Sequence, residues 1–305
     1  MKNFSKDQLA DVEVYIAEPN EQVREGMRGV LRDYGMRRTR TFGRIADLVE
    51  AIKQLPPDLL IAAADLDAGL FDAVRDIRHS RIGYNPFILI SLLVKGDAEG
   101  SAIKRAILAG ADDVMIKPVS PAKMLDRVAH FAMHRQPFIV TNDYLGPERR
   151  GTNDRPSKIK QLSVVNTLKA TIEGKRMTSS ELRNAIESNM AEVMSARLDS
   201  HGLKLGWVCG LILAAYREKR IDKELQERVL ILVGVLEDAG RTAHALGEPE
   251  LSQICIQMAR QVEELAEDYE NPSSLQLATI EKLTKAFELA KAAKSGPASP
   301  PPAAA

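Results

Sequence analysis

The sequence predicts an α/β fold in the first half of the chain and an all-α helical bundle in the second. From residue 12 to about residue 131, short apolar runs alternate five times with longer amphipathic stretches, as strands alternate with helices. From residue 158 to about 294 there is no strand pattern, and the apolar residues follow a helical period. A length of 305 residues fits two domains of ordinary size.

Five short apolar or β-branched runs are expected to form strands, because polar turn residues bound each of them. They are residues 12–17, 38–42, 58–63, 87–91 and 113–116. Asn20 is expected to cap the first helix, and Gly35 and Gly110 lie where a helix can end in a left-handed conformation. Strands joined by crossover helices form a parallel, doubly wound sheet, whose ligand site lies at the carboxyl ends of the strands.

The first domain is predicted to span residues 11–133. The periodicity then stops, and residues 134–157 are rich in Pro, Gly, Asn and Asp, as linkers are. Several linker residues are apolar enough to pack back onto the first domain, and a loose tether is the alternative. These residues are Phe138, Ile139, Val140, Tyr144 and Leu145. The helical domain is predicted at 158–294, and the tail at 295–305 is predicted to be disordered because it lacks packing residues.

Four breaks are expected between helices of the second half. They lie at Gly174, at His201-Gly202, near residues 247–249 and at Asn271-Pro272. The apolar runs GWVCGLILAAY and VLILVGVL fit the core of a bundle, and a homodimer interface is the alternative use of them. Cys209 and Cys255 have no paired spacing, so buried free thiols are expected.

Composition argues against several classes of protein. Lys plus Arg number 42 and Asp plus Glu number 42, so no net positive charge favours nucleic acid. Aromatic residues are only 5%, which is unlike a base-stacking surface. The longest apolar run, 205–216, is shorter than the about 20 residues that cross a bilayer. Acidic residues interrupt the start of the chain, unlike a secretory signal. We therefore expect a cytoplasmic protein that binds neither nucleic acid nor membrane.

Residues at the strand ends indicate which chemistry the sheet can perform. Phosphoryl transfer to a carboxylate needs an accepting Asp, further acids that hold Mg²⁺ and a Lys that pairs with the negative charge. Lys117 ends the fifth predicted strand, Ser91 ends the fourth, and Glu18 follows the first. Ala63 stands where the accepting carboxylate is required. The central residue of this chemistry is therefore missing.

Three segments carry a resemblance to a known family. They are VYIAEPNEQVREGMRGVLRDYG, PDLLIAAA and AILAGADDVMIKPVSPAKMLDRV. With them, residues 11–133 resemble the receiver domain of two-component response regulators, and QPFIVTNDYLGPERR resembles the tail that follows the receiver in a group of bacterial regulators. The resemblance implies a flavodoxin-like sheet with strand order 2-1-3-4-5. It also implies phosphorelay signal transduction through protein partners.

Carried over residue by residue, the resemblance also marks what this chain lacks. The family's acidic pair falls on Ala17 and Glu18, its phosphoacceptor on Ala63, its switch hydroxyl on Ser91, its lysine on Lys117 and its reorienting aromatic on Val114. Ordinary Asp phosphorylation is therefore not expected. The resemblance implies a pseudo-receiver that keeps a vestigial phosphorylation pocket of Glu18, Ala63, Ser91 and Lys117.

Asp65 is the alternative phosphoacceptor. It lies two residues beyond Ala63, and two residues of extended strand span roughly 6 to 7 Å, too far for the site unless the loop folds back. In that alternative Mg²⁺ is the cofactor and Glu18 its weak candidate ligand; otherwise no metal or cofactor is expected. Without an acceptor, Lys117 is expected to pair with Glu18.

We expect a bacterial signalling protein that regulates or scaffolds protein partners by contact and is not an enzyme. Intact receivers of the family bind partners through the face made of the fourth helix, fifth strand and fifth helix. Residues 98–108 and 120–127 are therefore the candidate partner surface. His201 and His244 lack the sequence context of a phosphotransfer histidine, so capping or surface roles are expected for both.

Overall fold

The structure is a computed structural model that describes residues 4–96, 100–149 and 159–292. The chain divides into two compact units, Met1–Met190 and Ala191–Ala305. The predicted disordered tail, 295–305, and residues 150–157 of the predicted linker lie outside the described residues.

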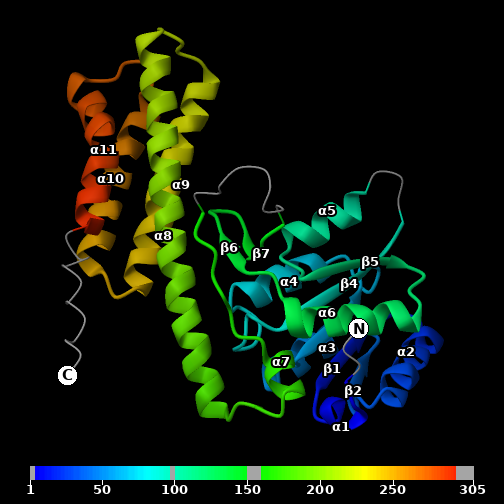
Figure 1. Cartoon of the computed structure of the whole chain (residues 1–305). Coiled ribbons are helices and arrows are strands. Elements are labelled where there is room, and N and C mark those ends of the chain that lie inside the picture. The colour runs from blue at the N-terminus through cyan, green and yellow to red at the C-terminus, as the bar shows by residue number, and fades with distance from the viewer. Residues whose placement is uncertain (1–3, 97–99, 150–158, 293–305) are drawn as a thin grey trace, which may run out of the picture. The chain divides into compact units, whose positions relative to one another are not determined.

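Five parallel strands form the main sheet of the first unit, in the order β2-β1-β3-β4-β5 (Figure 1). They are β1 (Glu13–Ala17), β2 (Arg38–Phe42), β3 (Leu59–Ala63), β4 (Leu89–Lys95) and β5 (Asp113–Lys117). Each neighbouring pair is parallel. The predicted doubly wound class and the order 2-1-3-4-5 are confirmed. In such a sheet the winding reverses between β1 and β3, which opens a crevice at their carboxyl ends.

Helices cover both faces of this sheet (Figure 1). They are α1 (Lys6–Leu9), α2 (Glu21–Asp33), α3 (Ile45–Gln54), α4 (Leu70–Arg78), α5 (Ser101–Leu108) and α6 (Pro121–His134). Because successive strand residues face opposite sides, Tyr15 packs with α3, α4 and α5, whereas Val14 and Ile16 pack with α2 and α6. Asn20 caps α2 as predicted, since its side chain accepts from the Val23 N–H.

β4 is longer than predicted and ends four residues later. The prediction ended this strand at Ser91, but the apolar run continues to Val94, and every β4 residue before Lys95 is buried. A central strand covered by helices on both faces stays apolar along its length, so the polar residue that ends it is Lys95 and not Ser91. Lys95 pairs in register with Lys117 at the end of β5.

The described part of the predicted linker forms a hairpin in the first unit. β6 (Phe138–Val140) pairs antiparallel with β7 (Leu145–Pro147), and Phe138 also bridges Leu162. Phe138, Ile139, Val140 and Leu145 are buried. The first compact unit therefore extends beyond residue 133, through α7 (Thr167–Ile172) to Met190, because these apolar residues pack against it.

A buried arginine network contacts the hairpin, because the guanidinium groups of Arg78 and Arg135 lie 5.2 and 5.0 Å from the Phe138 ring. The guanidinium of Arg78 donates to the carbonyl oxygens of Gly110, Pro86 and Ile88 at 2.7–2.8 Å and to the Asp112 carboxylate at 2.7 Å. Arg135 donates to the other Asp112 oxygen at 2.9 Å. The side chains of Arg78, Asp112 and Arg135 are nearly inaccessible to water. We call these three residues the buried arginine network.

The second unit is helical, as predicted. It contains the later part of α8 (Ser179–Arg217) together with α9 (Lys223–Ala245), α10 (Pro249–Glu267) and α11 (Ser274–Ala292). Leu205, Leu236 and Phe287 belong to its buried core. Among the described residues, no helix combines the length and apolar character of a membrane span.

The predicted break at His201-Gly202 is wrong, because α8 continues through both residues. His201 is buried, and its Nε2 lies 3.4 Å from the Thr242 hydroxyl on α9. A buried, partnered histidine stabilises the helix at this point instead of ending it. The chain turns instead between Arg217 and Lys223, where the Asp222 side chain caps α9.

Candidate functional site

Four charged side chains meet at the carboxyl ends of the strands. Glu18 follows β1, Asp65 follows β3, Lys95 ends β4 and Lys117 ends β5. Parallel strands bring their carboxyl ends to one edge of the sheet, and this is why four distant segments converge here. We call these four residues the lysine–carboxylate network.

Short ion pairs connect the four residues of the network in series. Lys117 Nζ lies 2.8 Å from Glu18 Oε2 and 2.8 Å from Asp65 Oδ1, and Lys95 Nζ lies 2.9 Å from Asp65 Oδ2. The Glu18 side chain is 4% exposed, that of Asp65 32% and that of Lys95 73%. The network therefore runs from the buried crevice out to solvent, with two positive and two negative groups.

Electrostatics within the network favour the charged forms of Asp65 and Lys117. Burial raises the pKa of the Asp65 carboxyl, but hydrogen bonds from Lys117 and Lys95 outweigh it and lower that pKa to about 2. Burial lowers the pKa of the Lys117 ammonium, but hydrogen bonds to Asp65 and Glu18 outweigh it and raise that pKa. Asp65 is therefore a carboxylate, and Lys117 an ammonium, at neutral pH.

A tight turn brings Asp65 into the site. Ala63 ends β3, Ala64 N–H donates to the Leu93 carbonyl at 2.8 Å, and Leu66 N–H donates back to the Ala63 carbonyl at 2.9 Å. The chain therefore folds back directly after the strand instead of continuing extended. This fold-back allows Asp65 to reach the site, which an extended strand would not.

The remaining predicted pocket residues lie as follows. Ala17 and Ala63 are buried at their strand ends. The prediction placed Ser91 at the end of β4, which is wrong. Ser91 lies in the middle of β4, where it is buried and its hydroxyl lies 3.3 Å from the Asp113 carboxylate. The predicted pairing of Lys117 with Glu18 is confirmed. Val114 lies on β5 and packs against the core on the α3, α4 and α5 face.

Sequence reasoning missed Lys95. Its signal was the length of the apolar run from Phe87 to Val94, which marks Lys95 as the first polar residue after the strand. Lys95 is level with Lys117 in the sheet, so it reaches the same carboxylate. Within the described part of the chain, no three His, Cys, Asp or Glu side chains gather as ligands for a metal ion.

An apolar groove adjoins the network. It has a volume of about 570 Å³, and α2, the end of β4 and the segment from Lys117 to α6 line it. Val23, Met27 and Met124 contribute apolar walls, while Lys95 and Lys117 contribute charged ones. The lysine–carboxylate network therefore borders apolar surface on the side of α2 and α6.

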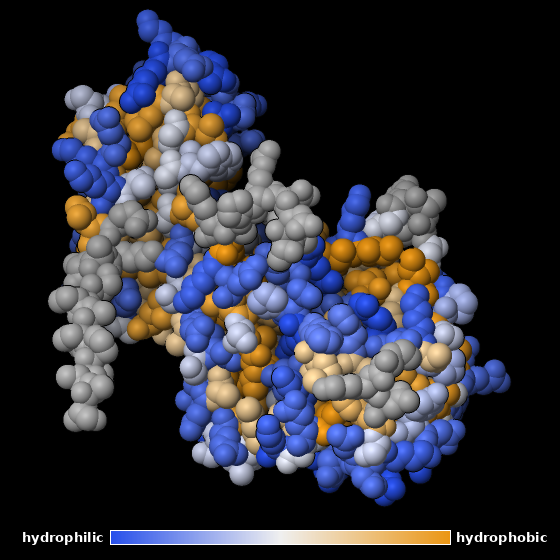
Figure 2. Space-filling view, viewed as in Figure 1, coloured by the Kyte–Doolittle hydropathy of each residue, from blue (hydrophilic) through white to orange (hydrophobic). Residues whose placement is uncertain are grey.

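The predicted partner surface carries exposed apolar side chains. Leu108 on α5 is 62% exposed and Ile116 on β5 is 47% exposed. Figure 2 shows apolar surface over α5 and β5. Of the predicted surface, residues 98–99 lie outside the described residues, and 120–127 include the start of α6, where the Ser120 side chain caps the helix.

The candidate groups of the helical half are two histidines and two cysteines. His201 is buried within the bundle, and His244 lies in the last turn of α9. Cys209 and Cys255 are buried free thiols, as predicted, and burial raises the pKa of each to about 11. At neutral pH both cysteines are therefore protonated and weakly reactive.

Comparison with known proteins gives structural similarity alone. No protein family model matches the chain, and no curated protein sequence is similar to it. Chemotaxis response regulator CheY4 of Vibrio cholerae is similar in structure at 18% identity, with a TM-score of 0.35 over 39% of this chain and 97% of that chain. A response regulator signal receiver domain from Bermanella marisrubri is similar at 18% identity, with a TM-score of 0.32 over 38% of this chain and 94% of that chain.

The order of the strands and the lysine at the end of β5 agree with what the sequence resemblance implied. The first unit therefore has a flavodoxin-like, doubly wound fold, with its sheet in the order 2-1-3-4-5.

Proposed function

We propose that this chain is a bacterial two-component signalling protein whose receiver-like unit acts through protein contacts without Asp phosphorylation. One observation carries the proposal: the lysine–carboxylate network pairs Glu18 and Asp65 with two internal ammonium groups. In this proposal the chain is a cytoplasmic pseudo-receiver, is not an enzyme and needs no cofactor.

The charge balance of the network supports this proposal. Mg²⁺ prefers carboxylate oxygens and waters, but both carboxylates of the network already bind ammonium groups at 2.8–2.9 Å. A metal ion would have to displace Lys117 from Glu18, whose side chain is almost fully buried. A metal ion at this site would therefore compete with an ammonium group that already contacts Glu18 at 2.8 Å. The lysines thus supply internally the positive charge that a metal ion would bring.

The partner surface supports action by contact. Leu108 and Ile116 are exposed apolar residues on neighbouring elements, and such residues anchor protein interfaces when a partner covers them. Replacing both with glutamate is expected to abolish capture of the partner. Leu55, which is 43% exposed elsewhere in the first unit, is the matched control for Leu→Glu.

Intact mass after incubation with Mg²⁺ and a small-molecule phosphodonor tests the proposal. We expect no added phosphoryl group on this protein, while an intact receiver in the same tube is labelled. Asp65→Asn and Lys117→Ala proteins are measured alongside. Labelling of the wild type at Asp65 would overturn the proposal.

The second candidate function is an active receiver that is phosphorylated at Asp65 with Mg²⁺. The observation in its favour is the 2.8 Å contact of Asp65 with Lys117. In that case Asp65→Asn is not labelled, whereas Asp67→Asn is labelled like the wild type. Asp67 is the matched control because it lies in the same loop and its Oδ1 accepts from the Gly69 N–H, a bond that asparagine retains.

A further inference from the structure

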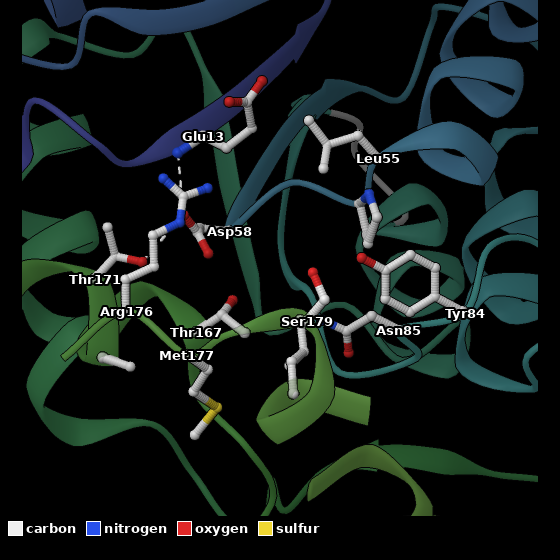
Figure 3. Close-up of a pocket in the computed structure, with 13 residues that line it drawn as sticks. Glu13, Leu55, Asp58, Tyr84, Asn85, Thr167, Thr171, Arg176, Met177 and Ser179 are labelled. Atoms are coloured by element: carbon white, nitrogen blue, oxygen red, sulfur yellow. Dashed lines mark hydrogen bonds between the residues drawn. The ribbon is translucent and has the colours of Figure 1, made fainter. Parts of the chain in front are cut away.

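Helix α8 belongs to both compact units, and its two parts differ in their surroundings. In the first unit its first residue, Ser179, lines a cavity of about 130 Å³ together with Asp58 and Thr171 (Figure 3). The Asp58 carboxylate is buried and already accepts from the Glu13 N–H at 3.0 Å and from the Thr171 hydroxyl at 3.4 Å. The part of α8 beyond Met190 lies in the second unit, and one of its sides faces solvent.

Five residues form this outward side, which we call the α8 face. They are Leu203, Trp207, Gly210, Leu211 and Ala214, and none of them carries a charge. Trp207 is 64% exposed and Leu203 is 61% exposed, although both side chains are large and apolar. Spacings of three and four residues place all five on one side of the helix. An apolar face of this kind anchors a protein interface when a partner covers it.

The α8 face has large side chains at one end and open space at the other. A Cβ added at Gly210 would meet no side chain and no neighbouring element within 4 Å. Consider two copies of α8 that pack antiparallel about a two-fold axis at residues 208–209. Trp207 of each copy then lies level with Gly210 of the other, and Leu203 lies level with Ala214 in the same way. The large side chains of each copy therefore fill the space that the small residues of the other leave.

The same arrangement brings opposite charges together. Asp199 and Arg217 are about five turns of helix apart, so they lie on the same side of α8, one turn before Leu203 and two turns after Gly210. Their midpoint lies at the two-fold axis, so Asp199 of each copy is level with Arg217 of the other. The Arg217 side chain is 73% exposed and its Nη2 lies 4.0 Å from Glu281, so it can turn toward another carboxylate. Charge complementarity therefore favours a second copy of this chain as the occupant of the α8 face.

We propose that the α8 face binds a second copy of this chain, with the two α8 helices antiparallel across a two-fold axis at residues 208–209. The contact is isologous, so each side chain of the face is used twice. Leu203 and Trp207 of both copies lie at its centre, and a pair of opposite charges lies at each end. The assembly holds two receiver-like units, whichever of the two candidate functions they perform.

Sedimentation velocity of the full chain from about 1 to 100 μM tests the proposal. We expect a dimer at the upper concentrations. Leu203→Glu places a charge in the apolar contact and is expected to weaken dimerisation by about tenfold or more. Leu289→Glu is the matched control, because Leu289 on α11 is also 61% exposed, and it should dimerise like the wild type. A monomer throughout this range would overturn the proposal, and so would undiminished dimerisation of the Leu203→Glu protein.

Trp207 is the only tryptophan of the chain, so its fluorescence reports on this contact directly. We expect its emission maximum to move to shorter wavelength as the dimer forms, because the ring is then withdrawn from water. The Leu203→Glu protein keeps the tryptophan and should emit at the longer wavelength throughout. Dimerisation with an unchanged emission maximum would mean that the copies meet elsewhere and would overturn the proposal.

Charge reversal tests the antiparallel arrangement. Asp199→Lys or Arg217→Glu alone places like charges at both ends of the contact, and each is expected to weaken dimerisation by about fivefold or more. An equal mixture of the two proteins should form a heterodimer about as tight as the wild type, because both ends again hold opposite charges. Arg260→Glu, at an exposed position on α10, is the matched control for Arg217→Glu and should have no effect. Undiminished dimerisation of both single variants, or a mixture as weak as its components, would overturn the arrangement.

Discussion

The lysine–carboxylate network and the buried arginine network lie in the same unit but differ in their access to water. Lys95 is 73% exposed and the network around it opens to solvent, whereas the side chains of Arg78 and Asp112 are each 1% exposed. Burial lowers the pKa of the Arg78 guanidinium to about 10, although Asp112 opposes this effect. Ions withdrawn this far must stay paired, whereas exposed ions can exchange partners.

This difference in exposure separates a network that stabilises the fold from one whose ion pairs can change partners. Asp112 binds two arginines and also accepts from the Ile90 N–H at 2.8 Å, so it joins α4, β4 and the end of α6. Asp65 pairs with Lys95 and Lys117, and both lysines can be reached by solvent. We therefore expect substitutions in the buried arginine network to change stability, and those in the lysine–carboxylate network to change mainly function.

Asp112→Asn should have the largest effect. Losing this carboxylate leaves Arg78 as an uncompensated buried charge, and we expect a loss of about 3–5 kcal/mol in the free energy of unfolding. Urea denaturation measures it. Asp76→Asn, which removes an exposed pair with Arg81, is the control and should cost less than about 1 kcal/mol. Equal costs for the two variants would contradict the distinction between the networks.

Gly110→Ala should have the next largest effect. Gly110 has φ +90°, and an added Cβ would lie 2.5 Å from the Leu145 carbonyl oxygen of the hairpin. We expect a loss of about 1–3 kcal/mol, measured by thermal and urea unfolding. Gly26→Ala on α2 is the matched control, because its Cβ meets no atom within 4 Å, and it should gain about 0.5–1 kcal/mol. A neutral Gly110→Ala would show that the hairpin can move away at little cost.

The free energy of unfolding at acidic pH should depend on the titration of Asp65. Its pKa is lowered to about 2, below its value of about 3.9 in the unfolded chain, so its stabilising contribution is complete above pH 4 to 5. That contribution is lost as the pH falls toward 2, and solvent screening keeps it near about 1 kcal/mol or less. The difference in unfolding free energy between wild type and Asp65→Asn should therefore shrink from pH 5 to pH 2. A constant difference would mean that the ion pairs contribute nothing.

Lys95→Ala should have the smallest effect. The side chain is mostly exposed, so its pair with Asp65 should contribute about 0–0.5 kcal/mol at low salt. About 1 M NaCl should remove most of that difference, because the Debye length then falls to about 3 Å. Thermal unfolding at two salt concentrations measures this. A large, salt-independent loss of stability would mean that Lys95 stabilises the fold in the way that the buried arginines do.

The sheet was predictable because its strands are apolar and its helices amphipathic. The strand order followed from the resemblance of three segments, and β2 begins and ends at the predicted residues despite its arginines. The end of β4 was misjudged because Ser91 interrupts an apolar run that the strand in fact continues through. The serine is tolerated inside the sheet because its hydroxyl meets the Asp113 carboxylate.

Half of the lysine–carboxylate network could be predicted. Glu18 and Lys117 lie at strand ends whose positions the pattern gives, and their pairing was expected. The position of Asp65 depends on a turn of four residues. The alternation of apolar and polar residues along a strand does not predict such a turn. In the helical half, a His-Gly pair resembles a helix end, but burial of His201 against α9 overrides that local preference.

The position of β2 at one edge of the sheet has a consequence for self-association. An outer strand exposes unpaired backbone groups that can template pairing with another chain. Arg38 and Arg40 alternate along β2 and are both exposed, so a second copy approaching this edge would bring like charges together. These arginines weaken the apolar pattern by which β2 is recognised as a strand, and we expect them also to oppose edge-to-edge pairing of two copies.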